Sequence, residues 1–367
     1  MRPRILWFCG LMVDLDALAS TASFMNMVSN IIYLDSPCGV GISYSKNENK
    51  YINDDLQTAA DTHKFLLKWF QLYPEFVTNP FYVSGESYAG IYVPTLAAEV
   101  VKGIKAGQKP IINFEEVQRT CKGNYQNLSD NCGDSIYKID QRILGLNLYD
   151  ILEPCYHDPE SDQHGKGNTS SNLPISFQQL GVTDRPLKVR KRMFGRAWPF
   201  WAFEKDGYFP MWSELAVQGS VPCINDEVAT IWLNDESVRK AIHAEPKSVA
   251  GPWEICSSRI VYGFGAGSML PYHQNLTTQG YRALIYSGDH DMCVPFTGTQ
   301  AWTRSLGYKI VDEWRAWSSN EQIAGYLQGY AHNLIFLTIK GAGHTVPEYK
   351  PRESLDFYKR WLDKGQI

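Results

Sequence analysis

Short apolar runs that end in polar or proline-containing loops alternate with amphipathic stretches along the chain. Runs rich in β-branched and aromatic residues predict four buried strands, at residues 30–35, 81–83, 282–287 and 334–340. Apolar residues at helical spacing predict helices at 53–73, 92–105 and 353–361. We expect Asn53 to cap the first helix and Pro94 to lie early in the second, where a helix tolerates proline. Strands that alternate with helices indicate an α/β fold, with a largely parallel sheet covered on both faces.

The middle third of the chain has a different character. Residues 115–225 are polar, contain cysteines and are punctuated by Pro and Gly. A cluster of positive charge between Arg185 and Arg196 predicts either a solvated surface run or an exposed site of proteolytic processing. We therefore divide the chain into an atypical N-terminal segment (1–27), a first part of the core (28–114), a cap or insertion (115–225) and a second part of the core (226–367).

Composition and charge exclude some classes of function. The chain has 367 residues, 44% of them hydrophobic, which is enough to bury one sizeable core. A net charge of -4 argues against a nucleic-acid binder, which needs a basic face. We expect no membrane span, because no apolar stretch reaches about 18 residues. Residues 5–13 are apolar and follow Arg2 and Arg4, which indicates either a weak signal peptide or an ordinary N-terminal segment.

Cysteines and sequons favour an oxidising compartment. None of the eight cysteines forms a C-x-x-C pair, so zinc binding is not expected. Three N-x-[ST] sequons begin at Asn127, Asn168 and Asn275. Together with spaced cysteines, they indicate a protein of the secretory pathway.

The sequence GESYAG at residues 85–90 lies between a predicted strand and a predicted helix. A nucleophile elbow requires this context, because a sharp strand-to-helix turn projects a serine hydroxyl clear of the backbone. Small residues on both sides let the strand and helix approach closely. The backbone N–H of Tyr88 would then point toward a developing oxyanion beside Ser87. The alternative is a serine in an ordinary tight turn.

A serine nucleophile needs a general base, and the base needs a carboxylate that orients it. His344 follows the last predicted strand, and Asp289 and Asp291 flank His290 after another strand. The order serine, aspartate, histidine is that of α/β-hydrolases. Either aspartate can orient His344. Adjacent loop residues rarely bind one ion without distant ligands, so we expect no metal and no other cofactor.

Longer motifs extend this pattern over residues 28–362. They are LDSPCGVGISYS, GESYAG followed by YVP, VPCINDEVATIWLN, SGDHDMCVPFTGT and GAGHTVPEYKP. In this order they resemble the serine carboxypeptidases of the plant type. The resemblance implies an α/β-hydrolase fold with a mostly parallel central sheet and an inserted helical cap.

The resemblance also implies a role for each site residue. Ser87 matches the nucleophile, His344 the base and Asp291 the orienting carboxylate. The N–H of Tyr88 matches one oxyanion donor, and Glu86 matches a glutamate that helps bind the C-terminal carboxylate of the substrate. Two carboxylates attract only when one of them carries a proton, which agrees with the acidic working pH typical of the family.

Two departures from the family pattern concern the scaffold. The family carries an Asn-Gly-Gly-Pro-Gly-Cys-Ser-Ser segment upstream of the LDSP strand, with a second oxyanion donor, and nothing like it occurs here. At Phe114–Glu115, two family motifs run together where relatives have a further strand and loop. The chain thus resembles a family member truncated or alternatively spliced near its N-terminus. We expect missing sheet strands and a loss of about 10²–10³ in turnover from the missing donor.

The resemblance also suggests a cysteine pattern. It implies two disulfides within the insertion, Cys121–Cys132 and Cys155–Cys223, and free thiols at Cys38 and Cys293. The usual partner of Cys256 would lie in the missing glycine-rich segment, and Cys9 is an unsupported replacement for it.

The expected function is release of C-terminal residues from peptide or protein substrates through an acyl-enzyme on Ser87. By resemblance, the protein would act in the vacuole or outside the cell. One alternative is an acyltransferase of the same family, which Glu86 disfavours because such relatives tend to have aspartate there. A second alternative is a catalytically inactive variant, which the missing glycine-rich segment supports.

Overall fold

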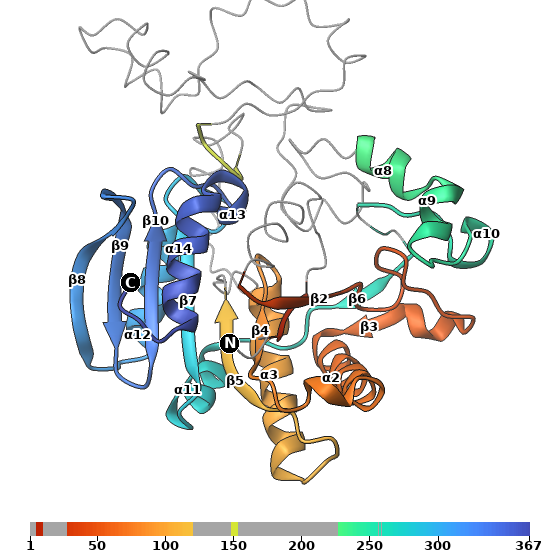
Figure 1. The fold of residues 1–367 in the computed structure, drawn as a ribbon, viewed down its shortest axis with the longest axis horizontal. Coiled ribbons are helices and arrows are strands. Elements are labelled where there is room, and N and C mark those ends of the chain that lie inside the picture. Colours follow the sequence, from red (N-terminus) through yellow and green to blue (C-terminus); the bar gives the residue numbers. More distant parts are fainter. Residues whose placement is uncertain (1–4, 10–27, 120–147, 153–226, 256, 258) are drawn as a thin grey trace, which may run out of the picture.

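The computed structural model describes residues 5–9, 28–119, 148–152, 227–255, 257 and 259–367 (Figure 1). Within this part, eight strands form one sheet in the order β2-β1-β4-β5-β7-β10-β9-β8. Their bounds are β1 (Ile5–Cys9), β2 (Asn30–Leu34), β4 (Phe81–Ser84), β5 (Phe114–Arg119), β7 (Arg282–Gly288), β8 (Ile310–Ser319), β9 (Gln322–Tyr330) and β10 (Leu334–Ile339). Neighbours from β2 to β10 are parallel, whereas β9 pairs antiparallel with both β10 and β8. The expected mostly parallel sheet is therefore confirmed.

Helices cover both faces of this sheet. The longer ones are α2 (Asp55–Leu72), α3 (Ala89–Lys105), α11 (Leu270–Thr278), α12 (Phe296–Ser305) and α14 (Pro351–Leu362). Shorter elements are α8 (Glu227–Leu233), α9 (Glu236–Ala241), α10 (Lys247–Ala250), α13 (Val346–Tyr349), the 3-10 helices η1 (Glu48–Tyr51) and η2 (Pro74–Phe76), and the paired strands β3 (Ile52–Asp54) and β6 (Val261–Gly263).

The strand period of two divides the core between the two faces. In β7, Ile285 packs in a cluster with side chains of α12, whereas Leu284 and Tyr286 pack with Phe357 of α14. Strand β4 is buried along its whole length. Its Val83 belongs to the cluster under α2 and α3, and Figure 1 shows α14 lying over the sheet near β7 and β10.

All four predicted strands and all three predicted helices are present, with shifted ends. Helix α2 is capped by Asp54 and not by Asn53, because the Asp54 carboxylate accepts a hydrogen bond from Gln57 N. Helix α3 begins at Ala89, directly after the turn that holds Ser87, so Pro94 lies inside the helix.

Two segments that the sequence excludes from the core belong to the central sheet. Strand β1 comes from the atypical N-terminal segment and pairs with both β2 and β4. Strand β5 contains the Phe114–Glu115 junction and pairs with both β4 and β7. The sheet is therefore continuous across the junction, and the predicted cap boundary at Glu115 falls within a central strand.

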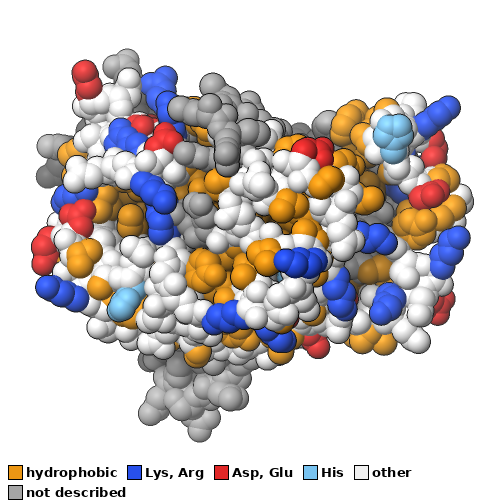
Figure 2. Space-filling model, turned by 60° about the horizontal axis from the view of Figure 1, so that its bottom comes forward, with side chains coloured by type: hydrophobic (Ala, Val, Ile, Leu, Met, Phe, Trp, Pro, Cys, Tyr) orange, Lys and Arg blue, Asp and Glu red, His pale blue; other side chains and the backbone are white. Residues whose placement is uncertain are grey.

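On the face shown in Figure 2, side chains of both charges are interspersed with hydrophobic ones. No helix among the described residues has the length and apolar character to cross a membrane.

Several predictions from the middle of the chain lie outside the described residues. These are the basic run Arg185–Arg196, the two insertion disulfides, Cys256 and the sequons at Asn127 and Asn168. Cys38 is a free thiol, as expected, and it is half-buried.

Candidate active site

The turn between β4 and α3 has the geometry of a nucleophile elbow. Ser87 has a φ of 56°, a left-handed conformation that a non-glycine residue adopts only when its surroundings hold it there. Helix α3 starts at once, since Ala89 N donates to the Glu86 carbonyl and Gly90 N donates to the Ser87 carbonyl. Fully buried Ala89 allows the helix to lie against the strand. The serine thus projects from the carboxyl end of β4.

His344 and Asp291 lie on two loops at the same edge of the sheet, after β10 and β7. The Nδ1 atom of His344 is 2.8 Å from Oδ2 of Asp291, and both residues are buried. The other carboxylate oxygen of Asp291 accepts a hydrogen bond from Val294 N. His344 Nε2 is buried and has no hydrogen-bond partner among the described residues, so it remains able to accept a proton.

Glycine lets these two loops approach each other. A Cβ atom on Gly288, the last residue of β7, would lie 2.2 Å from the Ala342 carbonyl oxygen in the histidine loop. Two residues after Gly288, the backbone N–H of His290 donates a hydrogen bond to the same Ala342 carbonyl at 2.9 Å. Any side chain at position 288 would push the aspartate and histidine loops apart.

The structure distinguishes between the two candidate aspartates. Asp289 accepts a hydrogen bond from Gly341 N and lies 3.7 Å from His290 Nε2. Asp291, and not Asp289, contacts the His344 ring. Asp289 therefore braces the backbone of the histidine loop. No group of three or more His, Cys, Asp or Glu side chains among the described residues is placed to hold a metal ion.

The electrostatics of the site centre on His344. Burial lowers the pKa of its imidazole, but the charge and hydrogen bond of Asp291, together with the charge of Glu86, outweigh burial and raise the pKa. Glu86 precedes Ser87 in the elbow. Its charge is one of those that raise the pKa of His344.

A buried carboxylate under the elbow was missed at the level of sequence. Asp55, 1% exposed at the start of α2, accepts hydrogen bonds from the Tyr88 hydroxyl at 2.8 Å and the Tyr262 hydroxyl at 3.0 Å. Its second oxygen accepts a hydrogen bond from Ala266 N. Burial and the neighbouring Asp55 raise the pKa of Tyr88, which keeps its hydroxyl a donor. Asp55 thereby anchors the residue that follows the nucleophile.

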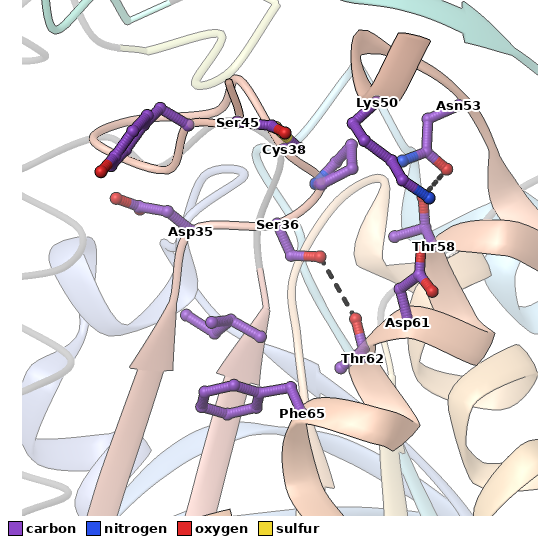
Figure 3. Close-up of a pocket in the computed structure, with 13 residues that line it drawn as sticks. Asp35, Ser36, Cys38, Ser45, Lys50, Asn53, Thr58, Asp61, Thr62 and Phe65 are labelled. Carbon is purple, nitrogen blue, oxygen red and sulfur yellow. Dashed lines mark hydrogen bonds between the residues drawn. The ribbon is translucent and has the colours of Figure 1, made fainter. Parts of the chain in front are cut away.

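The LDSPCGVGISYS motif forms a compact turn at the carboxyl end of β2. Ile42 N donates to the Asp35 carboxylate, and the Ser43 hydroxyl donates to the Asp35 carbonyl. Gly41 has a φ of 55° and lies against Asp35, where a Cβ atom would clash. The turn borders a cavity of about 370 Å³ (Figure 3), and two of its lining hydroxyls, on Ser36 and Thr62, are hydrogen-bonded to each other.

Comparison with known proteins agrees with this architecture. The serine carboxypeptidase family model matches residues 16–117 and 113–364, and its two matched stretches overlap at the Phe114–Glu115 junction. The chain is 54% identical to serine carboxypeptidase-like 20 of Arabidopsis thaliana, over 93% of this chain and 75% of the relative. It is also 54% identical to serine carboxypeptidase 1 of Hordeum vulgare, over 93% of this chain and 74% of the relative.

A solved structure shows the same fold. It is KEX1(delta)P, a prohormone-processing carboxypeptidase from Saccharomyces cerevisiae, with a TM-score of 0.62 and 16% sequence identity. The match covers 99% of this chain and 83% of the yeast chain.

Removing the Tyr88 hydroxyl should loosen the elbow. Tyr88→Phe deletes one donor to Asp55, and Tyr262→Phe, the matched control, deletes another. Each should lower the free energy of unfolding by about 1.5–3 kcal/mol, because the acceptor is a charged group. Only Tyr88→Phe should also slow the reaction of Ser87 with a fluorophosphonate, since Tyr88 adjoins the nucleophile. Urea unfolding and labelling rates measure the two effects, and equal slowing in both variants would contradict the anchoring role.

Proposed function

The chain belongs to the serine carboxypeptidase family and has the α/β-hydrolase fold, and from this premise we propose that Ser87, His344 and Asp291 form its catalytic triad. Ser87 attacks the carbonyl of the last peptide bond while His344 Nε2 takes its proton. The same histidine then protonates the leaving amine, and water releases the acyl group in a second cycle. The 2.8 Å contact between His344 and Asp291 is the observation that carries the proposal.

The aspartate acts by orientation and charge. When its proton is on Nδ1, His344 donates a hydrogen bond to Asp291, which leaves Nε2 unprotonated and able to act as the base. When Nε2 takes the proton of Ser87, the buried carboxylate stabilises the imidazolium that forms. The same stabilisation of the imidazolium by Asp291 contributes to the raised pKa of His344.

One oxyanion donor follows from the elbow itself. The backbone N–H of Tyr88 is the donor next to Ser87, and its orientation depends on the anchor at Asp55. The family's second donor comes from the glycine-rich segment that this sequence lacks. We therefore infer a turnover about 10²–10³ lower than that of a relative with both donors.

Glu86 supports specificity for a free C-terminus. Its charge is one of those that raise the pKa of His344, which supports a place for Glu86 in the proposed site. A substrate carboxylate can bind there when one of the two groups carries a proton, which favours an acidic working range. Protonated Glu86 also no longer raises the pKa of His344. Acid thus promotes substrate binding at Glu86, and the lost charge offsets part of the protonation of His344 that acid itself causes.

The setting we infer is the secretory pathway, with peptide or protein C-termini as substrates. The cysteines and sequons of the sequence support it. The yeast protein of the same fold is a prohormone-processing carboxypeptidase, and its substrates are of this chemical class.

The two aspartates of the β7 loop provide a matched pair for mutation. Asp291→Asn should lower kcat by about 10⁴, because the amide no longer selects the reactive tautomer of His344. Asp289→Asn should cause a far smaller loss, since an amide oxygen can still accept the hydrogen bond from Gly341 N. Steady-state hydrolysis of a blocked dipeptide measures both. A larger loss for Asp289→Asn in folded protein would reverse the assignment.

The pH profile of Ser87 labelling tests the electrostatics. Labelling by a fluorophosphonate needs neutral His344, so its rate rises as pH increases through the raised pKa of that histidine. Glu86→Gln removes a negative charge that raises this pKa, so the rising limb should move to lower pH. Glu99→Gln, which removes a carboxylate paired with Lys102 on α3, should leave the limb in place. If the pH at which the labelling rate rises is the same in Glu86→Gln and wild type, Glu86 does not act on His344.

A further inference from the structure

A short segment of the predicted insertion contacts two loops. These are the loop after β7 that carries Asp291 (the aspartate loop) and the loop after β10 that carries His344 (the histidine loop). Residues 148–152, which we call the clasp, contact the aspartate loop on each side of Asp291. The Leu148 carbonyl accepts hydrogen bonds from Met292 N and Cys293 N, both at 2.9 Å, and Ile151 N donates to the His290 carbonyl at 3.1 Å. The clasp therefore holds the backbone on both sides of the catalytic carboxylate.

The clasp also holds the histidine loop. His344 N donates to the Tyr149 carbonyl at 2.6 Å, and the Tyr149 and His344 rings meet edge to face with centroids 5.3 Å apart. Gly343 permits this contact, because a Cβ atom there would lie 2.4 Å from the Tyr149 carbonyl oxygen and 2.8 Å from Cβ of Asp150. The two catalytic loops and the clasp are packed backbone against backbone.

One charged pair lies within this contact. Asp150 is 2% exposed, and its Oδ1 atom lies 3.3 Å from His290 Nδ1. The same oxygen accepts a hydrogen bond from Leu152 N. A carboxylate buried this deeply needs a partner, and the partner is the histidine next to Asp291.

We propose that Asp150 and His290 are positioning residues, and that their pairing fixes the loop of Asp291 relative to His344. The proposal rests on the triad proposed above and deepens it. Neither residue touches the reacting atoms. His290 N donates to Ala342 O in the histidine loop and its carbonyl accepts from Ile151 N, so a shift of its ring would move the backbone of all three segments.

Charge makes this positioning depend on pH. Burial lowers the pKa of His290, but Asp150 and Asp289 outweigh burial and the opposing charge of Lys350, so the pKa is raised. A histidine whose pKa is raised by folding contributes stability at low pH, and that contribution is lost as pH rises through the folded-state pKa. The ion pair is therefore intact in the acidic range that the proposed function favours.

Asp150→Asn tests the proposal, because asparagine keeps an oxygen acceptor and removes the charge. The fluorophosphonate labelling rate should fall roughly 10-fold at acidic pH, since small displacements of catalytic groups cost one to two orders of magnitude. The difference in labelling rate between the variant and wild type should narrow as pH rises past the pKa of His290, because that histidine is then neutral and the wild-type ion pair is lost as well. Asp356→Asn, which breaks the half-buried pair with Arg360 on α14, should leave the rate unchanged at every pH.

Other outcomes overturn the proposal. Wild-type rates for Asp150→Asn at all pH values would exclude positioning, and slowing by one constant factor would show a structural role only. If Asp150→Asn does not give a cooperative melt, His290→Gln replaces it, and the same pH-dependent gap is expected. A third variant, His344→Ala, separates failure of the proposed triad from failure of the positioning role. Labelling at the wild-type rate in His344→Ala would refute the triad itself, whatever the Asp150 result.

Discussion

The hydrogen bond between Asp291 and His344 depends on the register of two parallel strands. In β7 and β10, Ser287 pairs with Thr338 and Gly288 with Ile339, so both strands end at the same level of the sheet. The chain leaves each strand into a loop that carries one partner. Because Gly288 has no side chain, the loops meet closely enough for a 2.8 Å contact between Asp291 and His344. A slip of one residue in this pairing would turn the inward side chains outward and separate the pair.

One central strand, β5, joins the strand that leads to Ser87 and the strand that leads to Asp291. Strand β5 lies between β4, which presents Ser87, and β7, which leads to Asp291. Strands covered on both faces are usually continuous apolar runs, whereas β5 reads FEEVQR. Its backbone register places Glu116 in one row with Tyr82 of β4 and Arg282 of β7. The sequence of β5 therefore departs from the apolar pattern expected of a central strand.

Local patterns were sufficient to predict the elements that carry the triad. Strand β4, the turn at Ser87 and the two later strands have clear apolar runs bounded by polar loops. The choice between Asp289 and Asp291 could not come from such patterns, because both follow the same strand and only the path of the loop decides which contacts His344. The family resemblance favoured Asp291, and the geometry agrees with it.

Asp55 and Asp150 were missed for a different reason. The partner of Asp55 on β6, Tyr262, is 207 residues away, and an aspartate at a helix start ordinarily signals a cap. Asp150 stands between Tyr149 and Ile151, and no local pattern indicates that its partner is His290. Strands β8 and β9 were not predicted from the sequence. The turn between them uses Asn320 and Glu321 at positive φ, and only the asparagine is a common residue in such a turn. Long-range partners, and turns built without glycine, leave little trace in a single sequence.

The central claim is that Ser87 removes C-terminal residues from peptides, and matched peptide substrates test it most directly. A blocked dipeptide with a free C-terminus and the same dipeptide as its C-terminal amide differ only in the group that Glu86 is proposed to bind. Purified protein at acidic pH should release the last residue from the acid much faster than it hydrolyses the amide, and Ser87→Ala should abolish release. Equal hydrolysis of both substrates, or release that persists in Ser87→Ala, would contradict the account.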